Sequence, residues 1–309
     1  MHYFDLRDIT MRQKPSKVRT SSFTNLSLAT LLIFSFLCVA PIVLIFTSSI
    51  TSETALALRG YRYFPAEISF SSYKYLWARR ATIFRCYFIS ISVTAIGTMM
   101  GVFISMMLAY PLTRPAIRHR NLITFLIFFT MLFNGGVVAS YMVWTRMFGI
   151  KNTYGALLFP NLLCNAFNIL LVKNYYLSSV PVEILEAAQL DGASEAGVFF
   201  RVVMPLSKPV MTTIGLFTAL AYWNDWVNGL YFINDSSLYS IQVYLNVLMN
   251  NIQYLKSGNV YGLTGAQMSL PSIAIRMALA VTAMLPMLIV FPFIQKPLIK
   301  GVVMGGLKG

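Results

Sequence analysis

Five residues in the second half of the chain carry side chains suited to a polyhydroxylated ligand. The stretch ALAYWNDWVNGLYF places two tryptophans beside two amides and a carboxylate. Indole rings cover the apolar C–H face of a sugar, while amide and carboxylate groups bond its hydroxyls. The alternative is that the carboxylate pairs with a neighbouring helix and the tryptophans lie at a membrane interface. These candidates are Trp223, Asn224, Asp225, Trp226 and Asn228.

A second unusual segment is an acidic island between apolar stretches. Four of the ten acidic residues of the chain lie between residues 183 and 195. Pro181, followed by two glutamates, indicates a helix start, Gly192 a break, and Pro205 the end of a second short helix. Two short exposed helices suit a groove on another protein. The alternative is a loop that folds back onto the membrane surface.

The composition explains what surrounds these segments. Of 309 residues 57% are apolar and only 11% charged, and the mean hydropathy is +0.66. Soluble domains carry roughly a quarter charged residues, so the chain is predicted to lie in a membrane. The net charge of +14 is explained by Lys and Arg in tails and loops, which orient the membrane segments and contact anionic lipid headgroups. No basic stretch accompanies a nucleic-acid-binding motif, so we expect no nucleic-acid partner.

Cysteine and histidine supply no site chemistry. The three cysteines lie far apart in apolar runs, and the two histidines are isolated. This pattern predicts neither a disulfide framework nor a metal site. No cluster of His, Asp and Glu is available for a membrane-embedded enzyme, so we expect no catalytic residues.

Six charge-poor windows are long enough to cross a bilayer, which needs about 20 apolar residues. The sequence therefore predicts an all-α polytopic membrane protein with six transmembrane helices. Residues 20–52 hold no charge and follow a basic tail, residues 1–19, which indicates a retained anchor rather than a cleaved signal. The predicted helix cores are 27–50, 86–110, 122–145, 154–173, 209–233 and 275–294.

Lys and Arg set the orientation. With the N-terminus inside, 14 of the 24 basic residues lie on the cytoplasmic side and ten outside, six of them between residues 59 and 85. This bias favours cytoplasmic termini, although the first outer segment weakens it. Residues 181–205 are then a cytoplasmic loop, 234–273 an extracytoplasmic loop and 295–309 a C-terminal tail. Long loops are commonly functional or disordered, and function is favoured for 234–273.

The acidic island resembles the EAA loop of ABC importer permeases. Glu186, Ala187 and Ala188 are followed after three residues by Gly192, and after nine more by the run ending at Pro205. Val202 and Met204 stand where the family has Ile and Leu. The surrounding AAQLDGA is typical of carbohydrate-uptake permeases, and residues 20–309 resemble the maltose-type family, in its branch for complex-polysaccharide oligosaccharides.

The resemblance implies a type I importer permease fold over residues 20–309, in the plasma membrane of a bacterium. It implies that the EAA loop docks onto an ATPase subunit as a coupling helix. The residues carried over are Glu186, Ala187, Ala188, Asp191, Gly192 and Pro205. An acidic island in a basic protein would give that docking surface a distinct charge.

The resemblance also implies partners: a second homologous permease, two ATPase subunits, an extracytoplasmic solute-binding protein, an oligosaccharide substrate and membrane lipid. ATP and Mg would be bound by the ATPase, because this chain has no G-x-x-x-x-G-K-[ST] phosphate loop and needs no cofactor of its own.

The remaining expectations concern contacts with the substrate and with the binding protein. Asp225 is the only carboxylate within a predicted span, which marks it as a pathway candidate. Asn134, in the sequence FNGG, is a further pathway candidate, in addition to the five residues between Trp223 and Asn228 named above. In the maltose-type systems the partner permease carries most sugar contacts. The position of loop 234–273 implies contact with the binding protein through Tyr244, Asn250, Tyr254 and Tyr261.

Two other readings remain open. An ABC importer permease for a solute other than an oligosaccharide fits the same motifs. An ion-coupled secondary transporter is less favoured, since it would require several intramembrane carboxylates.

Overall fold

The computed structural model describes residues 22–256 and 273–306, which are predominantly helical. No strand occurs in those two ranges; the only extended pairing there is an isolated bridge between Thr51 and Ile68. Three helices are long and apolar enough to cross a membrane: α1 (Ser22–Ser49), α4 (Arg80–Thr113) and α15 (Ile273–Gly306). The predicted all-α membrane architecture is confirmed at this level.

Two further candidate spans are sharply bent. Helix α5 (Arg120–Leu132) meets α6 (Gly136–Met142) and the π-helical turn η1 (Val143–Met147) at 116°. The segment Glu195–Leu206 meets α12 (Lys208–Trp223) at 80°. By length and composition the described part of the chain therefore contains three spans, or up to five if each bent pair is one span.

The region predicted as the fourth span is not one helix. It contains α7 (Tyr154–Leu158) and α8 (Ala166–Ser179), joined by an irregular segment, residues 159–165. Pro160 lacks a backbone N–H and Asn161 has a positive φ of 63°, which explains why the helix stops here. Hydropathy alone did not reveal the interruption, because the segment contains no charge.

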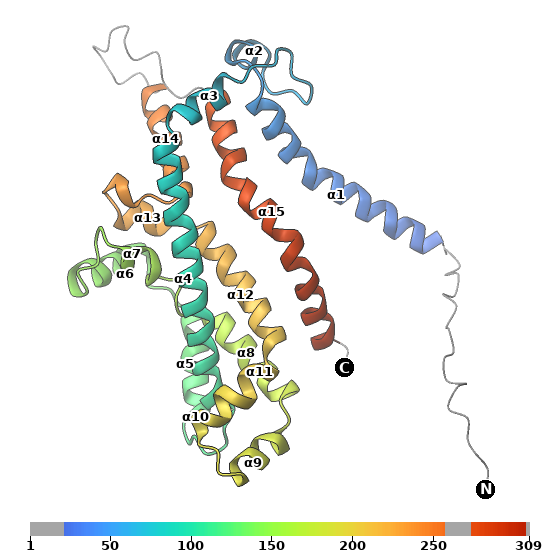
Figure 1. The fold of residues 1–309 in the computed structure, drawn as a ribbon, viewed down its shortest axis with the longest axis vertical. Helices are drawn as coiled ribbons and strands as arrows, with labels where there is room; N and C mark the ends of the chain where they lie inside the picture. The colour runs from blue at the N-terminus through green and yellow to red at the C-terminus, as the bar shows by residue number, and fades with distance from the viewer. Residues whose placement is uncertain (1–21, 257–272, 307–309) are drawn as a thin grey trace.

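Helix α4 is the central element of the bundle. It runs along most of the molecule, while α5, α8 and α12 lie beside the half that bears the α9–α11 hairpin (Figure 1). Helix α15 packs against α12 and α1, and α1 diverges from the rest of the bundle (Figure 1). The most apolar part of α1 has no residue buried against the rest of the described chain, so its surface is open to lipid or another subunit.

Glycine brings α4 and α12 into close contact. A Cβ atom added to Gly97 would lie 2.4–2.7 Å from ring carbons of Tyr222. The Tyr222 hydroxyl donates a 2.7 Å hydrogen bond to the carbonyl of Leu158 in α7. One buried tyrosine thus packs on α4 and ties α12 to the interrupted fourth segment.

Short helices cover the ends of the long ones. Helices α2 (Glu53–Arg59) and α3 (Ser71–Ala78) lie between α1 and α4 in the chain. The Glu53 carboxylate accepts 3.0 Å hydrogen bonds from the backbone N–H groups of Ile273 and Ala274, which begin α15. Helices α13 (Val227–Phe232) and α14 (Ile241–Lys256), with the 3₁₀ turn η3 (Ser236–Leu238), follow α12.

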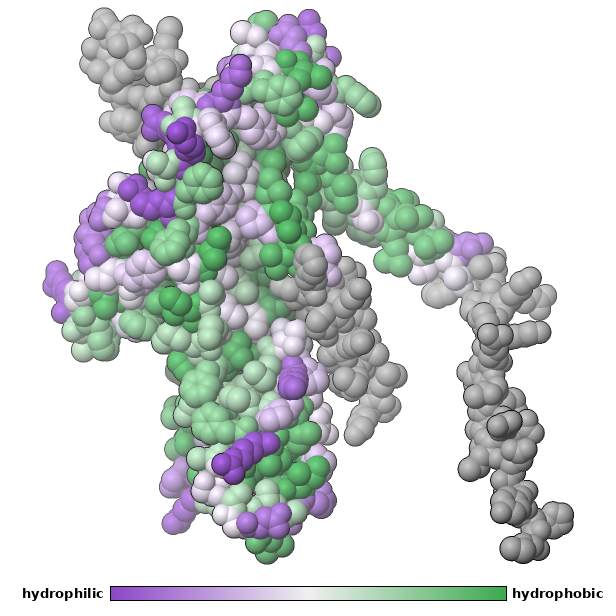
Figure 2. Space-filling view, viewed as in Figure 1, coloured by the Kyte–Doolittle hydropathy of each residue, from purple (hydrophilic) through white to green (hydrophobic). Residues whose placement is uncertain are grey.

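The visible surface follows this arrangement. Apolar residues cover α1 and much of the sides of the bundle, whereas polar residues gather near its two ends and on the flank where α6 and α13 lie (Figure 2). This distribution matches a protein surrounded by lipid along its middle, where water is absent.

Candidate functional site: the α9–α11 hairpin and the broken helices

The predicted EAA segment forms a helical hairpin at one end of the bundle (Figure 1). Helix α9 (Val182–Leu190) begins after Pro181, with Glu183 in its first turn. The N–H of Gly192 bonds the carbonyl of Gln189 at 3.0 Å, and Gly192 has φ = +83°. A left-handed residue is needed for this turn, and glycine adopts it without steric cost. The break predicted at Gly192 is confirmed.

The second arm of the hairpin is longer than predicted. It comprises α10 (Glu195–Val198), the π-helical turn η2 (Phe199–Val203) and α11 (Met204–Leu206). Ser194 starts it, with a hydroxyl that accepts a 3.2 Å bond from the N–H of Gly197. The prediction that Pro205 ends this arm is wrong. Pro205 lies inside the first turn of α11, where its missing N–H is tolerated. The bend follows at Ser207, before α12.

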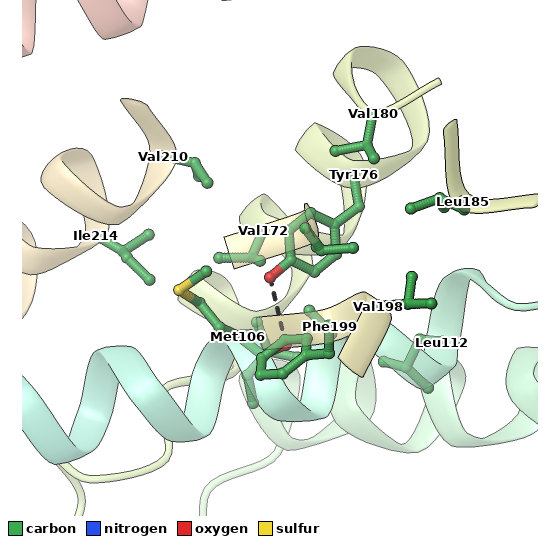
Figure 3. Packing of buried hydrophobic residues seen from close by; sticks show 13 residues of the cluster. Met106, Leu112, Val172, Tyr176, Val180, Leu185, Val198, Phe199, Val210 and Ile214 are labelled. Atoms are coloured by element: carbon green, nitrogen blue, oxygen red, sulfur yellow. Dashed lines mark hydrogen bonds between the residues drawn. The ribbon is translucent and has the colours of Figure 1, made fainter. Parts of the chain in front are cut away.

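The inner side of the hairpin is an apolar anchor (Figure 3). Leu185 from α9 and Val198, Phe199 and Val203 from the second arm are all at most 7% exposed. They pack with residues of α4, α8 and α12 into one cluster, whose other labelled members are Met106, Leu112, Val172, Tyr176, Val180, Val210 and Ile214. The hairpin is therefore folded onto the bundle rather than extended from it.

The outer side of the hairpin is acidic and partly apolar. Glu183, Glu186, Ala187 and Asp191 are exposed, and Ala188 is half-buried. Leu190, at the end of α9, is 89% exposed, and Val182 and Ile184 of the same helix are 56% and 44% exposed. Single exposed apolar residues are common, whereas several on one short helix indicate an interaction surface. The sequence motif indicated the glutamates and alanines but gave no signal for Leu190.

The helix break after α12 explains the candidates Asn224 and Asp225. The Asp225 carboxylate accepts hydrogen bonds from the N–H groups of Val227 (3.0 Å) and Asn228 (3.2 Å), which begin α13. The Asn224 amide donates 2.9 Å to the carbonyl of Leu220. Asp225 thus acts as a helix cap in this structure. These two backbone hydrogen bonds stabilise the Asp225 carboxylate, which explains how it is accommodated without a cationic partner among the described residues.

The other members of this cluster separate. Trp223 is 5% exposed and packs in a core with residues of α3, α4, α14 and α15. Asn228 is 2% exposed, and its amide donates 2.9 Å to the carbonyl of Pro160. Trp226 is 42% exposed. The two indole rings therefore have different surroundings, and only Trp226 presents a large exposed face.

A small hollow with a mainly apolar lining and several polar side chains brings together two candidates that lie far apart in the sequence. Asn134 and Asn228 both line a pocket of about 130 Å³ between the α5–α6 break and α13. The Asn134 side chain accepts 2.8 Å from the N–H of Gly136, whose φ is +80°. Ser140, Asn161 and Tyr231 complete its polar lining, and the Ser140 hydroxyl is buried without a hydrogen-bond partner among residues 22–256 and 273–306. Sequence reasoning missed these three residues.

A second hollow of about 290 Å³ lies between α8 and α12. Asn165, Asn168 and Thr218 supply its polar groups, and the Asn168 amide donates 3.1 Å to the Thr218 hydroxyl. The irregular segment 159–165 contributes residues to both hollows. Non-helical backbone at membrane depth is tolerated where it is buried in protein or lines a water-filled cavity.

The outer-loop candidates lie partly outside the described residues. Tyr244 packs against the core that contains Trp223, and the Asn250 amide donates 2.9 Å to the Asn246 side chain. Tyr254 falls within α14, with its side chain outside the described residues, and Tyr261 lies wholly outside them.

The start of that loop is a charged turn. Hydrogen bonds from the Ser237 hydroxyl (2.6 Å) and N–H (2.8 Å) hold the pKa of the Asp235 carboxyl below its usual range. Elsewhere, no group of three or more His, Cys, Asp or Glu side chains within 22–256 and 273–306 is placed to hold a metal ion.

Comparison with known proteins settles the family. The chain is 34% identical over 281 residues to the polygalacturonan/rhamnogalacturonan transport system permease protein YtcP of Bacillus subtilis (strain 168), covering 90% of this chain and 96% of that protein. It is 37% identical over 271 residues to the protein LplC of the same organism, covering 88% and 90%. The chain belongs to the sugar-transport permeases of ABC transporters. No family model matches it.

A solved structure agrees with this assignment. The permease superposes with a TM-score of 0.73 and 29% identity on a chain of a bacterial ABC transporter involved in the import of the acidic polysaccharide alginate, covering 92% of this permease and 99% of that chain. The permease is therefore a multi-pass cell-membrane protein of a sugar or oligosaccharide importer and not an enzyme. Permeases of this kind work with a partner permease, an ATPase and a binding protein.

Proposed function

We propose that this permease is half of the translocation path of an ATP-driven importer for an acidic oligosaccharide. It crosses the membrane six times, and both termini lie in the cytoplasm. The six crossings are the three long helices α1, α4 and α15, the two bent spans, and the α7–α8 segment. Its hairpin docks on one of two ATPase subunits, which bind ATP and Mg, and a second permease and an extracytoplasmic binding protein complete the importer.

The observation that carries the coupling role is the two-sided hairpin. Its inner side is anchored in the core shared by α4, α8 and α12, and its outer side exposes Glu183, Glu186, Asp191 and Leu190. A rigid element with an unpartnered mixed surface transmits movement from a docked protein to the helices beneath it. A groove with basic and apolar residues on the ATPase would complement this surface.

The substrate path is proposed to pass the two hollows, each of which carries amide and hydroxyl groups within a mainly apolar lining. Both are bounded by interrupted helices, which is how many transporters place backbone and amide groups at a substrate. Asn134, Ser140, Asn161 and Tyr231 provide amide and hydroxyl groups for sugar hydroxyls, and Trp226 an exposed ring. Asp225 shapes the site as a helix cap. The partner permease would line the opposite side.

The charge of the outer face favours an acidic substrate. The six basic residues between 59 and 85 are all exposed, and none forms an ion pair within the described residues. Three carboxylates lie nearby and each accepts hydrogen bonds: Glu53 caps α15, Glu67 accepts 2.8 Å from the Ser52 hydroxyl, and Asp235, which also interacts electrostatically with Arg85, accepts from Ser237. Basic residues usually lie on the cytoplasmic side of a membrane protein, so six of them on the proposed outer side require an explanation. Attraction of a negatively charged sugar supplies one.

Two of these cations are already paired with aromatic rings. The Arg79 guanidinium lies 5.2 Å from the centre of the Tyr75 ring, and that of Arg80 lies 5.7 Å from the Trp77 ring. A guanidinium binds a carboxylate through two parallel hydrogen bonds, and an aromatic face suits the C–H side of a sugar. Uronate residues carry both groups. Two of the similar proteins, YtcP and the alginate importer, are named for acidic polysaccharides, whereas relatives at 26–27% identity are named for the neutral sugars melibiose, raffinose and stachyose and for arabinooligosaccharides.

The test uses the complete importer in vesicles with matched sugars. Trigalacturonate should stimulate ATP hydrolysis and enter, and neutral galactotriose should do so poorly. The variant Arg79→Gln with Arg80→Gln should raise the KM for trigalacturonate about tenfold, an effect that weakens at high salt. Equal transport of both sugars would contradict the acidic substrate, and a salt-independent KM would contradict electrostatic attraction. Failure of any sugar to stimulate ATP hydrolysis would contradict the importer itself.

A further inference from the structure

One acidic side chain of the hairpin does not belong to its exposed docking surface. The Glu195 carboxylate lies next to the cytoplasmic end of α4. Its Oε2 accepts a 2.6 Å hydrogen bond from the Tyr110 hydroxyl and lies 3.3 Å from Nη2 of Arg114. The Arg114 side chain is only 15% exposed, whereas that of Glu195 is 61% exposed. Glu195 therefore reaches inward to a largely buried cation.

The second oxygen of the same carboxylate binds the first arm of the hairpin. Oε1 of Glu195 accepts a 2.6 Å hydrogen bond from Nε2 of Gln189, near the end of α9. One carboxylate thus joins three elements: α4 through Tyr110 and Arg114, α9 through Gln189, and α10, which carries it. The EAA pattern gave no signal for this role, because Glu195 lies outside the motif positions.

Tyr110 of α4 and Arg114, which follows the last residue of α4, also contact one another. The Arg114 guanidinium lies 4.8 Å from the centre of the Tyr110 ring and donates to the Tyr110 hydroxyl, and neither contact involves the hairpin. The Tyr110 ring lies 5.3 Å from that of Phe199, in the buried part of the hairpin. The Arg114–Tyr110 contact restricts both side chains, which reduces the entropy lost when they bind the carboxylate.

This contact has a mechanical consequence. The hairpin is connected through the chain to α8 and α12, whereas α4 is reached only through space. Helix α4 has 34 residues and spans about 51 Å at 1.5 Å per residue, from the hairpin to the outer face. Apolar packing beneath the hairpin is non-directional, while charge-assisted hydrogen bonds fix distance and orientation. Within the described residues, Arg114–Glu195 is also the only salt bridge.

We propose that Glu195 is a positioning residue that fastens the α9–α11 hairpin to α4. Its contacts with Tyr110, Arg114 and Gln189, here called the clip, pass movement of α9 to α4 as well as to α8 and α12. The proposal rests on the proposed docking of α9 on the ATPase. Without the clip, the ATPase still binds and hydrolyses ATP, but less of the movement reaches the outer half of the permease. The clip thus determines the number of sugars imported per ATP.

The experiment compares two matched variants in the complete importer, reconstituted in vesicles. Glu195→Gln removes the charge of the clip, and Glu186→Gln removes a charge of equal size from the docking surface. For each we measure co-purification of the ATPase, ATP hydrolysis, and trigalacturonate uptake per ATP. Glu195→Gln should assemble normally and lower uptake per ATP about tenfold, within the usual range of coupling between sites. Glu186→Gln should instead weaken assembly, with normal uptake per ATP in the complexes that form.

A charge exchange separates the clip from general damage to the fold. Combining Arg114→Glu with Glu195→Arg should restore most of the uptake per ATP lost in either single variant. Normal uptake per ATP in Glu195→Gln would overturn the proposal, and so would weakened assembly like that of Glu186→Gln. Failure of the exchange variant to recover would also overturn it. Normal assembly of Glu186→Gln would instead count against the proposed docking surface, whatever the clip variants show.

Discussion

Leu190 offers the sharpest test of the docking surface, because its side chain has almost no role inside the permease. It is 89% exposed at the end of α9, so Leu190→Ala should change the stability of the permease by less than about 0.5 kcal/mol. If an ATPase groove covers this side chain, the substitution removes about three buried carbon groups at roughly 0.8 kcal/mol each. The expected loss of about 2.4 kcal/mol corresponds to about 50-fold weaker binding.

The assay titrates the purified permease pair in mild detergent with a fluorescently labelled ATPase subunit. Leu58→Ala is the matched control, since Leu58 is 86% exposed and lies in α2, on the outer side in our topology. Both variants should elute and melt like the wild type, and only Leu190→Ala should raise the Kd. Wild-type affinity of Leu190→Ala, or an equal loss for Leu58→Ala, would refute the assignment of α9 as the docking helix.

Substitutions at three further positions test the geometry. Gly192→Asn should retain most uptake, because asparagine tolerates a positive φ. Gly192→Val should lose uptake while the permease still inserts into the membrane. Equal uptake in the two variants would contradict the requirement for a positive φ at this turn. Asp225→Asn should keep the α13 cap and retain uptake, and Asp225→Ala should lower thermal stability by about 1 kcal/mol; abolished uptake in Asp225→Asn would assign the charge a direct role. Gly97→Ala should destabilise the α4–α12 contact by about 1–3 kcal/mol, measured by thermal melting in detergent, because the buried Tyr222 ring has nowhere to move; an unchanged melting temperature would contradict that packing.

The α9–α11 hairpin was predictable because its signals are local. Proline before α9, glycine at the left-handed turn and the acidic first turn act within a few residues of one another. The π-helical turn before Pro205 and the exposure of Leu190 were not predictable, because they depend on how the hairpin folds onto α4, α8 and α12. The role of Glu195 likewise depends on a residue 85 positions away in the sequence.

The membrane helices show the same limit. Hydropathy found α1, α4 and α15, where apolar length alone decides the structure. It did not find the interruptions at residues 133–135, 159–165 and 224–226, because asparagine, glycine and proline break a helix without changing its hydropathy greatly. The candidate site residues Asn134 and Asn228 lie at or beside two of these interruptions, so the residues were visible in the sequence while their shared pocket was not.

Which side of the membrane carries the α9–α11 hairpin, and what covers it, decides the whole account. A permease with Cys38, Cys86 and Cys164 replaced by serine would carry a single cysteine, from either Leu190→Cys or Leu58→Cys. In cells, a membrane-impermeant maleimide should label the cysteine at position 58 and leave that at 190 unmodified. In inside-out vesicles, position 190 should be labelled without the ATPase and protected when it is bound. Labelling of position 190 from outside the cell, or equal labelling with and without the ATPase, would contradict the account.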